Sequence, residues 1–318
     1  MKNLYLGVDG GQSGTVALIA DEDGSIVGRG SAGPCNHVGS SEAKAKLARV
    51  VHECVAAASV SAGLPAATKF EAACFGMSGG ASDKQATLQQ TIAAKQWLVT
   101  DDAVIALSGA LMGEAGVIVI AGTGSIALGR GAEGPVRRAG GWGYVFGDEG
   151  GAFDIVREAL RACLRAEEGW GERTRLSEAF SLATGCIDMN AVLHLFYTPE
   201  WPRSRIAAIA SKVDAYAAEG DAIATQVLAQ AAQSLALFAQ SVARQIWVRD
   251  QSAICSYVGG VFQSAAVLHR YRALLELSEC TVVAPMLGPA AGALIEAFRL
   301  AGAVPDSAKL LSSKFGHE

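Results

Sequence analysis

Asp9 stands at the end of a short apolar run and opens a glycine-rich turn, Gly10-Gly11-Gln12-Ser13-Gly14-Thr15. Glycine lets the backbone bend tightly and lets N–H groups approach a phosphate with no Cβ in the way. A carboxylate at the end of a strand can hold Mg²⁺ through its oxygens, directly or through water. A plain β-hairpin turn is the alternative interpretation of this segment.

A second glycine turn follows another buried run, as Ala121-Gly122-Thr123-Gly124-Ser125. Two such turns, each after an apolar strand and each with hydroxyl groups, favour a pair of phosphate-binding hairpins. The chain has no GxxxxGK[ST] segment, which excludes a P-loop enzyme. GTGSIALG continues into a strand pattern rather than a helix, which excludes a dinucleotide-binding fingerprint.

Asp101 and Asp102 end a predicted strand and enter an apolar helix. A carboxylate at a helix N-terminus commonly caps the free backbone N–H groups, and capping alone would explain either residue. One aspartate can instead act as a general base that accepts a hydroxyl proton during phosphoryl transfer, with a gain of roughly 10²–10⁴-fold in rate.

The segment 140–151 holds six glycines and three aromatic residues. Such a composition does not form a stable helix or strand, and function is a better reason than folding to keep so flexible a loop. Trp142 is suited to stack on the face of a sugar, and Asp148 to accept hydrogen bonds from sugar hydroxyls. The alternative is that Asp148 or Glu149 caps the following helix.

Hydrophobic periodicity predicts an α/β chain in two halves, each opened by strands joined through a glycine turn. We expect a first domain over 1–115 and a second over 116–318, with a nucleotide cleft between them. The predicted strands cover 4–8, 15–20, 25–29, 70–76, 97–100, 116–121, a strand ending at 129, 253–258 and 280–284. The predicted helices cover 41–62, 83–95, 262–277, 290–302 and helical stretches within 152–248, and 135–151 is expected to be irregular.

The composition excludes several classes of protein. Hydrophobic residues make up 51% and charged residues 18%, and the net charge is −5 without a run of Lys or Arg. This is a chain with a sizeable core and not a nucleic-acid binder. The seven cysteines form no CxxC pair, which argues against zinc, an iron–sulfur cluster or a disulfide framework and predicts a reducing compartment, the cytoplasm. We expect no signal peptide and no membrane span.

Taken together, the segments resemble the BadF/BadG/BcrA/BcrD-type ATPases, and within them the N-acetylglucosamine kinases. VDGGQSGT resembles the first phosphate motif and IAGTGS the second, while GGWGYVFGDEGGAF is similar to the sugar-side loop. Four further segments resemble family motifs in the expected order. GPCNHVG resembles the segment with the sugar-binding Asn, and VTDDA the segment with the catalytic Asp. SYVGGVFQSA resembles the adenosine motif, and LGPAAGAL the C-terminal glycine segment. The resemblance implies a two-domain actin-like ATPase fold, which is ribonuclease H-like.

The resemblance also implies a function, the phosphorylation of an amino sugar by ATP and Mg²⁺, expected at O6 of N-acetylglucosamine. Glucosamine, N-acetylmannosamine and N-acetylmuramyl sugars stay open as acceptors, because Ile126 stands where mammalian relatives have Asn. The implied partners are the sugar and MgATP, without nucleic acid or membrane. The resemblance is also compatible with a homodimer formed through the mid-chain helices. The implied roles are Asp102 as the base, Asp9 at the metal, Asn36, Ser125, Gly141, Trp142 and Asp148 at the sugar, and Gly10, Gly11, Gln12, Ser13, Gly122, Thr123, Gly124, Gly259, Gly260 and Gly288 at ATP.

Three other functions compete with this one. Gly76-Met77-Ser78-Gly79-Gly80 fits the GxSxG nucleophile motif of serine hydrolases, but His194 and His269 lie in helical patterns and no loop histidine completes a triad. A sensor on the same fold would add a DNA-binding helix-turn-helix, which is not seen before the first strand. An ATPase of the same family without a sugar acceptor is the third alternative, and Asn36 with the GGWG loop argues against it.

Overall fold

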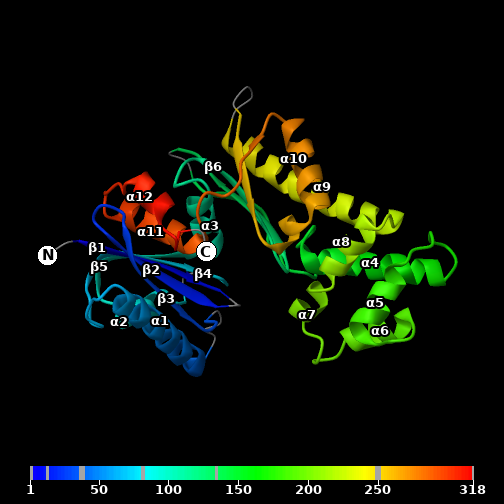
Figure 1. Cartoon of the computed structure of the whole chain (residues 1–318), viewed down its shortest axis with the longest axis horizontal. Helices are drawn as coiled ribbons and strands as arrows, with labels where there is room; N and C mark the ends of the chain where they lie inside the picture. Colours follow the sequence, from blue (N-terminus) through cyan, green and yellow to red (C-terminus); the bar gives the residue numbers. More distant parts are fainter. Residues whose placement is uncertain are drawn as a thin grey trace. The chain divides into compact units, whose positions relative to one another are not determined.

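The computed structural model describes residues 3–11, 14–35, 40–79, 83–132, 135–247 and 252–316. The chain folds into two compact units: Met1–Ala115 together with Ala284–Glu318, and Gly116–Val283. Each unit is built on its own five-stranded mixed sheet (Figure 1).

The sheet of the first unit has the strand order β3-β2-β1-β4-β5. Its strands are β1 (Leu4–Gly10), β2 (Thr15–Asp21), β3 (Ile26–Ala32), β4 (Phe70–Met77) and β5 (Ala94–Asp101). The first three are antiparallel neighbours, whereas β4 pairs parallel with both β1 and β5. The five strands predicted at 4–8, 15–20, 25–29, 70–76 and 97–100 are therefore confirmed.

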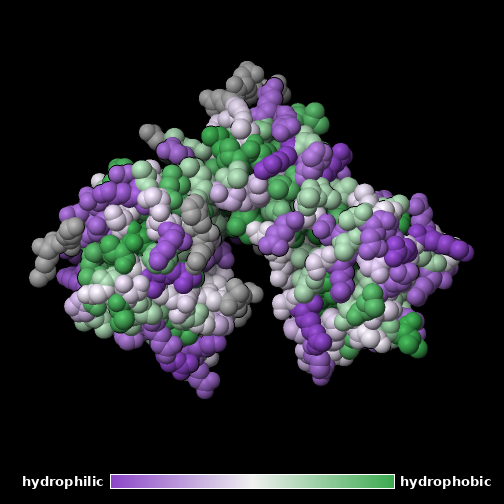
Figure 2. Space-filling view, in the orientation of Figure 1, coloured by the Kyte–Doolittle hydropathy of each residue, from purple (hydrophilic) through white to green (hydrophobic). Residues whose placement is uncertain are grey.

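Alternating side chains of β1 supply a core on each face of this sheet. Leu6 and Val8 pack toward α1 (Ser41–Ser61), while Tyr5 stacks on Phe298 at a ring-centroid distance of 3.8 Å on the other face. That second face is covered by α3 (Asp102–Ala110) and α11 (Pro289–Leu300) (Figure 1). The outer side of α1 is hydrophilic in Figure 2, as expected for an amphipathic helix on a sheet.

The domain boundary at the C-terminal end differs from the prediction. The predicted second domain covers 116–318, but in the structure residues 284–318 belong to the first unit. The physical reason is close backbone packing: a Cβ on Gly7 of β1 would overlap Leu294 N of α11, and one on Gly292 would overlap the Ile105 carbonyl of α3. Only glycine permits this approach, so α11 is seated on β1 and α3, followed by α12 (Ser307–Ser312).

The sheet of the second unit has the order β10-β9-β6-β7-β8. Its strands are β6 (Gly116–Ala121), β7 (Ser125–Arg130), β8 (Arg137–Gly140), β9 (Ile254–Val258) and β10 (Thr281–Val282). β6 and β7 form the antiparallel glycine-turn pair that the sequence predicts, and β6 pairs parallel with β9. β8 lies within the segment that was expected to be irregular, because it adds to the free edge of β7.

Helices make up the rest of the second unit. They are α4 (Ala152–Glu167), α5 (Leu176–Thr184), α6 (Met189–Phe196), α7 (Arg203–Ala207), α8 (Ala210–Ala218), α9 (Ala222–Ile246), α10 (Ala265–Glu276) and a 3₁₀ turn at Gly260–Gln263. Within the described residues, α9 is long and apolar enough to span a membrane by length and composition alone. Its apolar face, including Leu228, Leu235 and Val242, is buried in the core of this unit beside the sheet and α10.

One predicted helix is much shorter than expected. The pattern over 83–95 predicts a helix, but α2 covers only Gln85–Thr91, and Ile92 is already extended with φ −120° and ψ 132°. Residues from Ala94 onward pair with β4 as strand β5. Pairing with the buried strand β4 outweighs the helix propensity of Ala-Ala-Lys-Gln.

Candidate active site

Asp9 lies at the carboxyl end of the parallel strands of the first unit. It is in register with Gly76 on β4, which in turn is in register with Thr100 on β5. Carboxyl ends of parallel strands are the usual place for ligands in open α/β sheets. Two residues beyond Thr100, Asp102 begins α3, so the strand register places both aspartates at one edge of the sheet.

Electrostatics link these two aspartates. Burial and, to a smaller extent, the negative charge of Asp102 together raise the pKa of Asp9 to about 6. Burial also raises the pKa of Asp102, with a smaller contribution from Asp101, while backbone N–H donors at the start of α3 lower it. A carboxylate with a raised pKa is a stronger base, and a close pair of carboxylates attracts a cation.

Asp101 has a different environment from Asp102. It occupies the N-cap position of α3 but makes no side-chain capping bond, and it is exposed. Asp102 is half-buried and accepts from the Ala103 N–H in the first helical turn. Burial and the electrostatic interaction with Asp9 thus favour Asp102 as the base, while Asp101 does not make the predicted capping bond.

The first glycine turn is a tight hairpin beside Asp9. The Gly11 N–H donates to the Gly14 carbonyl at 2.9 Å, and the Ser78 N–H donates to the Gly10 carbonyl at 3.1 Å. Gly10 has no room for a Cβ because Met77 and Cys35 fill the space. The predicted Gln12, Ser13 and Asn36 lie outside the described residues.

Lys84 is a charged residue near this edge that sequence reasoning missed. Its side chain is only 1% exposed, its ammonium lies 3.4 Å from Asp83, and its positive charge lowers the pKa of Asp102. Lysine is rarely so buried, and this buried cation helps keep Asp102 ionised. Its place before a seven-residue helix gives no sequence signal, because an isolated lysine is ordinarily a solvated surface residue.

The second glycine turn is fixed in place by helix α4. The Gly122 N–H donates to the Gly124 carbonyl at 2.9 Å, and the Ala152 and Phe153 N–H groups donate to the Gly122 and Thr123 carbonyls at 2.8 and 3.1 Å. A free helix N-terminus leaves several N–H groups without partners, and here the hairpin accepts from them. The hairpin and the helix therefore form one rigid corner.

Gly259 meets this corner from strand β9. It has a φ of +112°, and a Cβ there would overlap the Ala121 carbonyl oxygen just before the hairpin. The predicted adenosine motif is thus beside the predicted second phosphate motif, within one unit. Gly260, Val261, Gln263, Ser211 and Asp214 line a cavity of about 400 Å³ next to it.

The loop after β8 contains the predicted sugar ligands. Asp148 is 6% exposed and has a left-handed backbone with φ +61°, which is uncommon for a residue other than glycine. Its carboxylate pairs with the guanidinium of Arg203. The N-cap of α4 is Gly151, with no side-chain cap, so neither Asp148 nor Glu149 caps this helix.

Other predicted sugar residues hold this loop. The Ser125 hydroxyl donates to the Glu149 carbonyl at 2.6 Å, and the Gly141 N–H donates to the Ser125 carbonyl at 3.0 Å. A Cβ on Gly141 would press on the Ile126 side chain, so Ile126 packs against this loop. Trp142 is 67% exposed, and the Arg138 guanidinium lies 4.7 Å from its ring centroid.

The predicted nucleotide glycines are divided between the two units, and Gly288 lies in the same unit as Gly10 and Gly11. Gly288 belongs to the first unit, whereas Gly259 and Gly260 belong to the second. It is the N-cap of α11, and its carbonyl fills the place of a Cβ on Gly109. Its role in nucleotide binding remains a prediction.

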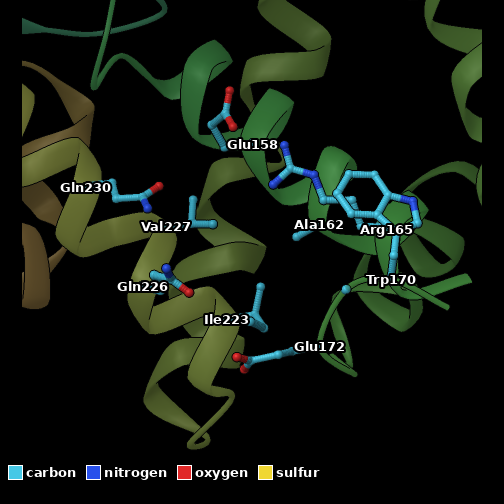
Figure 3. A pocket seen from close by; sticks show the side chains of 10 residues that line it. Glu158, Ala162, Arg165, Trp170, Glu172, Ile223, Gln226, Val227 and Gln230 are labelled. Atoms are coloured by element: carbon cyan, nitrogen blue, oxygen red, sulfur yellow. The ribbon is translucent and has the colours of Figure 1, made fainter. Parts of the chain in front are cut away.

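A further cavity in the second unit is remote from these motifs in sequence. It has a volume of about 290 Å³ between α4 and α9 and is lined by Glu158, Arg165, Trp170, Glu172 and Gln226, among others (Figure 3). None of the predicted site residues lines it.

Ser78, the alternative nucleophile, lies in the first unit, whereas His194 and His269 lie on helices α6 and α10 of the second unit.

Comparison with known proteins places these motifs in a family. An N-acetylmuramic acid/N-acetylglucosamine kinase from Clostridium acetobutylicum is 34% identical over 176 residues, which are 54% of this chain and 56% of that protein. An N-acetyl-D-glucosamine kinase from Dictyostelium discoideum is 30% identical over 189 residues, 56% of this chain and 59% of the relative. The chain spans little more than half the length of these curated relatives.

Solved structures share the whole architecture. A candidate N-acetylglucosamine kinase from Chromobacterium violaceum superimposes with a TM-score of 0.73 at 28% identity, covering 92% of this chain and 98% of that one. A ROK family glucokinase from Streptomyces griseus, solved with glucose and AMPPNP, gives 0.55 at 18% identity, covering 94% and 99%. This likeness confirms the predicted actin-like, ribonuclease H-like fold class. The profile of the BadF/BadG/BcrA/BcrD ATPase family matches residues 6–297, and the chain belongs to that family.

Proposed function

We propose that this protein transfers the γ-phosphoryl group of ATP to a hydroxyl of an amino sugar, at O6 of N-acetylglucosamine. The observation that carries the proposal is the pair Asp9 and Asp102 at one edge of the first sheet, each with a raised pKa. Family membership supports ATP use, and the curated relatives named above are N-acetylglucosamine kinases.

Asp102 is the general base in this proposal. As the sugar oxygen attacks the γ-phosphorus, the bond from that phosphorus to the β–γ bridging oxygen breaks and ADP leaves. The hydroxyl proton passes to the Asp102 carboxylate, whose raised pKa makes it a stronger base than an ordinary aspartate. The acetamido group takes no part in this step.

Asp9 would hold Mg²⁺. Within the described residues, no group of three His, Cys, Asp or Glu side chains could bind a metal ion alone. That fits Mg²⁺, which is usually bound by one or two carboxylates together with substrate phosphates and water. When bound, Mg²⁺ neutralises the charge of the transferring phosphates.

The nucleotide would use the two glycine hairpins and the cavity at Gly260. We assign the phosphates to Gly10–Ser13 and Gly122–Gly124, whose glycines carry no Cβ that would hold a phosphate away from the backbone. The 400 Å³ cavity is wide enough for a nucleoside, and Ser211, Asp214 and Gln263 provide polar contacts there. Gly288 completes the predicted nucleotide set.

The sugar would contact Asn36, Ser125, Gly141, Trp142 and Asp148. Ile126 offers no hydrogen bond to an acetamido group, so glucosamine and N-acetylmuramyl sugars are alternative acceptors.

All seven cysteines are free thiols, which fits the reducing cytoplasm as the place of the reaction. The homodimer stays a prediction, which light scattering after gel filtration tests.

A coupled assay of ADP release over a set of amino sugars with MgATP tests the proposal. The expected result is turnover of N-acetylglucosamine, with the new phosphate ester placed at C6 by NMR. Turnover of glucosamine or of an N-acetylmuramyl sugar alone would change the acceptor but keep the reaction class. ATP hydrolysis without any sugar product would instead identify an ATPase that lacks a sugar acceptor.

A further inference from the structure

Arg203 is a cationic side chain that meets the predicted sugar loop from a distant part of the chain. It is the first residue of α7, 55 residues beyond Asp148, and its Nη2 pairs with Asp148 Oδ2. Its guanidinium also lies over two aromatic rings, 5.1 Å from the centroid of Tyr144 and 5.8 Å from that of Phe153. Arg203 therefore touches both the loop and the start of α4.

The surroundings of Asp148 make this ion pair the main support of its carboxylate. Asp148 is almost fully buried and its backbone is in the left-handed region, so the side chain is held at an uncommon angle. The carboxylate and the guanidinium together occupy the space where residue 124 would have a Cβ. The glycine of the second phosphate turn thus exists partly to admit this ion pair.

We propose that Arg203 is a positioning residue for sugar binding, because it fixes the Asp148 carboxylate with one oxygen occupied and the other left to accept from sugar hydroxyls. This inference rests on the proposed function, in which Asp148 binds the sugar. A planar guanidinium that lies over two aromatic rings has few orientations, so it fixes the plane of the carboxylate as well as its charge.

An unpaired buried carboxylate is costly and would turn toward water. Without Arg203, Asp148 would lose its orientation while the phosphate turns and Asp102 kept theirs. The effect should therefore fall on sugar binding and spare ATP binding. Removal of a hydrogen-bonded charged partner corresponds to a loss of roughly 10- to 100-fold in affinity.

The chain offers a matched control two residues away. Arg205 stacks on Trp201 at 4.1 Å and donates to the Glu200 carbonyl at 3.0 Å, but it does not touch the loop. Arg203 also lines a cavity of about 570 Å³ beside α4 and α6, so its replacement by Met creates no new void in a packed core. Both Arg203→Met and Arg205→Met are expected to fold.

Steady-state kinetics of the full-length protein test the proposal. Arg203→Met should raise the sugar KM roughly 10- to 100-fold while the ATP KM changes less than about threefold, and Arg205→Met should change neither. Arg203→Lys should restore little, because an ammonium cannot reproduce the planar contact of a guanidinium with the carboxylate and the two rings. In an Asp148→Asn background, Arg203→Met should add no further loss, because the two act through one contact.

Amide hydrogen exchange supplies a readout that needs no sugar turnover. In the free protein, Arg203→Met should speed exchange at 147–151 relative to wild type and to Arg205→Met. An unchanged sugar KM and unchanged exchange in Arg203→Met would overturn the positioning role. If the wild type phosphorylates no sugar, the proposed function fails, and faster exchange at 147–151 would still show that Arg203 orders the loop.

Discussion

At the scale of single residues, Asp102 and Asp101 are neighbours with the same side chain but opposite surroundings. We predict that Asp102→Asn lowers kcat by at least ~10²-fold, because the amide cannot accept the sugar proton. ATP binding should stay near normal, since no nucleotide contact is assigned to Asp102. Isothermal titration with ATP and steady-state rates with the best sugar measure both quantities.

Asp101→Asn is the matched control for this prediction. Asp101 is exposed and makes no capping bond, so its amide variant should keep turnover within a few-fold and unfold at an unchanged temperature. Loss of turnover in Asp101→Asn with retention in Asp102→Asn would move the base to the other residue.

Asp9 makes metal binding depend on pH. Its pKa of about 6 means that the carboxylate takes up a proton as pH falls through that value, and a protonated acid no longer binds Mg²⁺ well. The affinity for Mg²⁺ in the presence of ATP should therefore rise with pH between about 5 and 7. Titrations at several pH values measure this midpoint.

The sign of the coupling to Asp102 gives a sharper form of the same prediction. The negative charge of Asp102 raises the pKa of Asp9, so Asp102→Asn should move the midpoint to lower pH without removing the effect of burial. Asp101→Asn should leave the midpoint unchanged. A shift to higher pH in Asp102→Asn would show that the two carboxylates do not interact as the structure indicates.

At the scale of elements, α11 depends on glycine where it crosses α3. A Cβ at Gly292 would overlap the Ile105 carbonyl, and neither backbone can move without shifting the helix. We predict that Gly292→Ala destabilises the protein by about 1–3 kcal/mol, measured by urea unfolding. Gly33→Ala, at a site with open space around it, should change the stability far less.

Elements with local signals were predictable from the sequence, and those fixed by distant partners were not. The strand pair at Asp9, the second glycine turn and Asp102 at the start of a helix all follow from local patterns. The short helix α2 does not, because strand pairing with β4 decides where it ends. Arg203 is also hidden, since a helical arginine carries no sign of a contact 55 residues away.

At the scale of the whole molecule, the chain enters, leaves and re-enters the first unit. One core of that unit joins Tyr5, Leu18 and Cys74 to α11 residues such as Leu294 and Phe298. The second unit is a single continuous segment with a core of its own. Asp9 and Asp102 therefore belong to a unit that is complete only when the C-terminal segment has been added.

This arrangement predicts different behaviour for separate fragments. Residues 116–283 should fold alone, with a cooperative thermal transition by circular dichroism, because their core lies entirely within the segment. Residues 1–115 alone should aggregate, since the face of β1 and β4 that α11 covers would be exposed. Joining 284–318 to 1–115 through a flexible linker should restore a soluble, cooperatively melting unit. If 1–115 alone melted as cooperatively as the joined fragment, the C-terminal helix would be an accessory to this unit rather than part of its core.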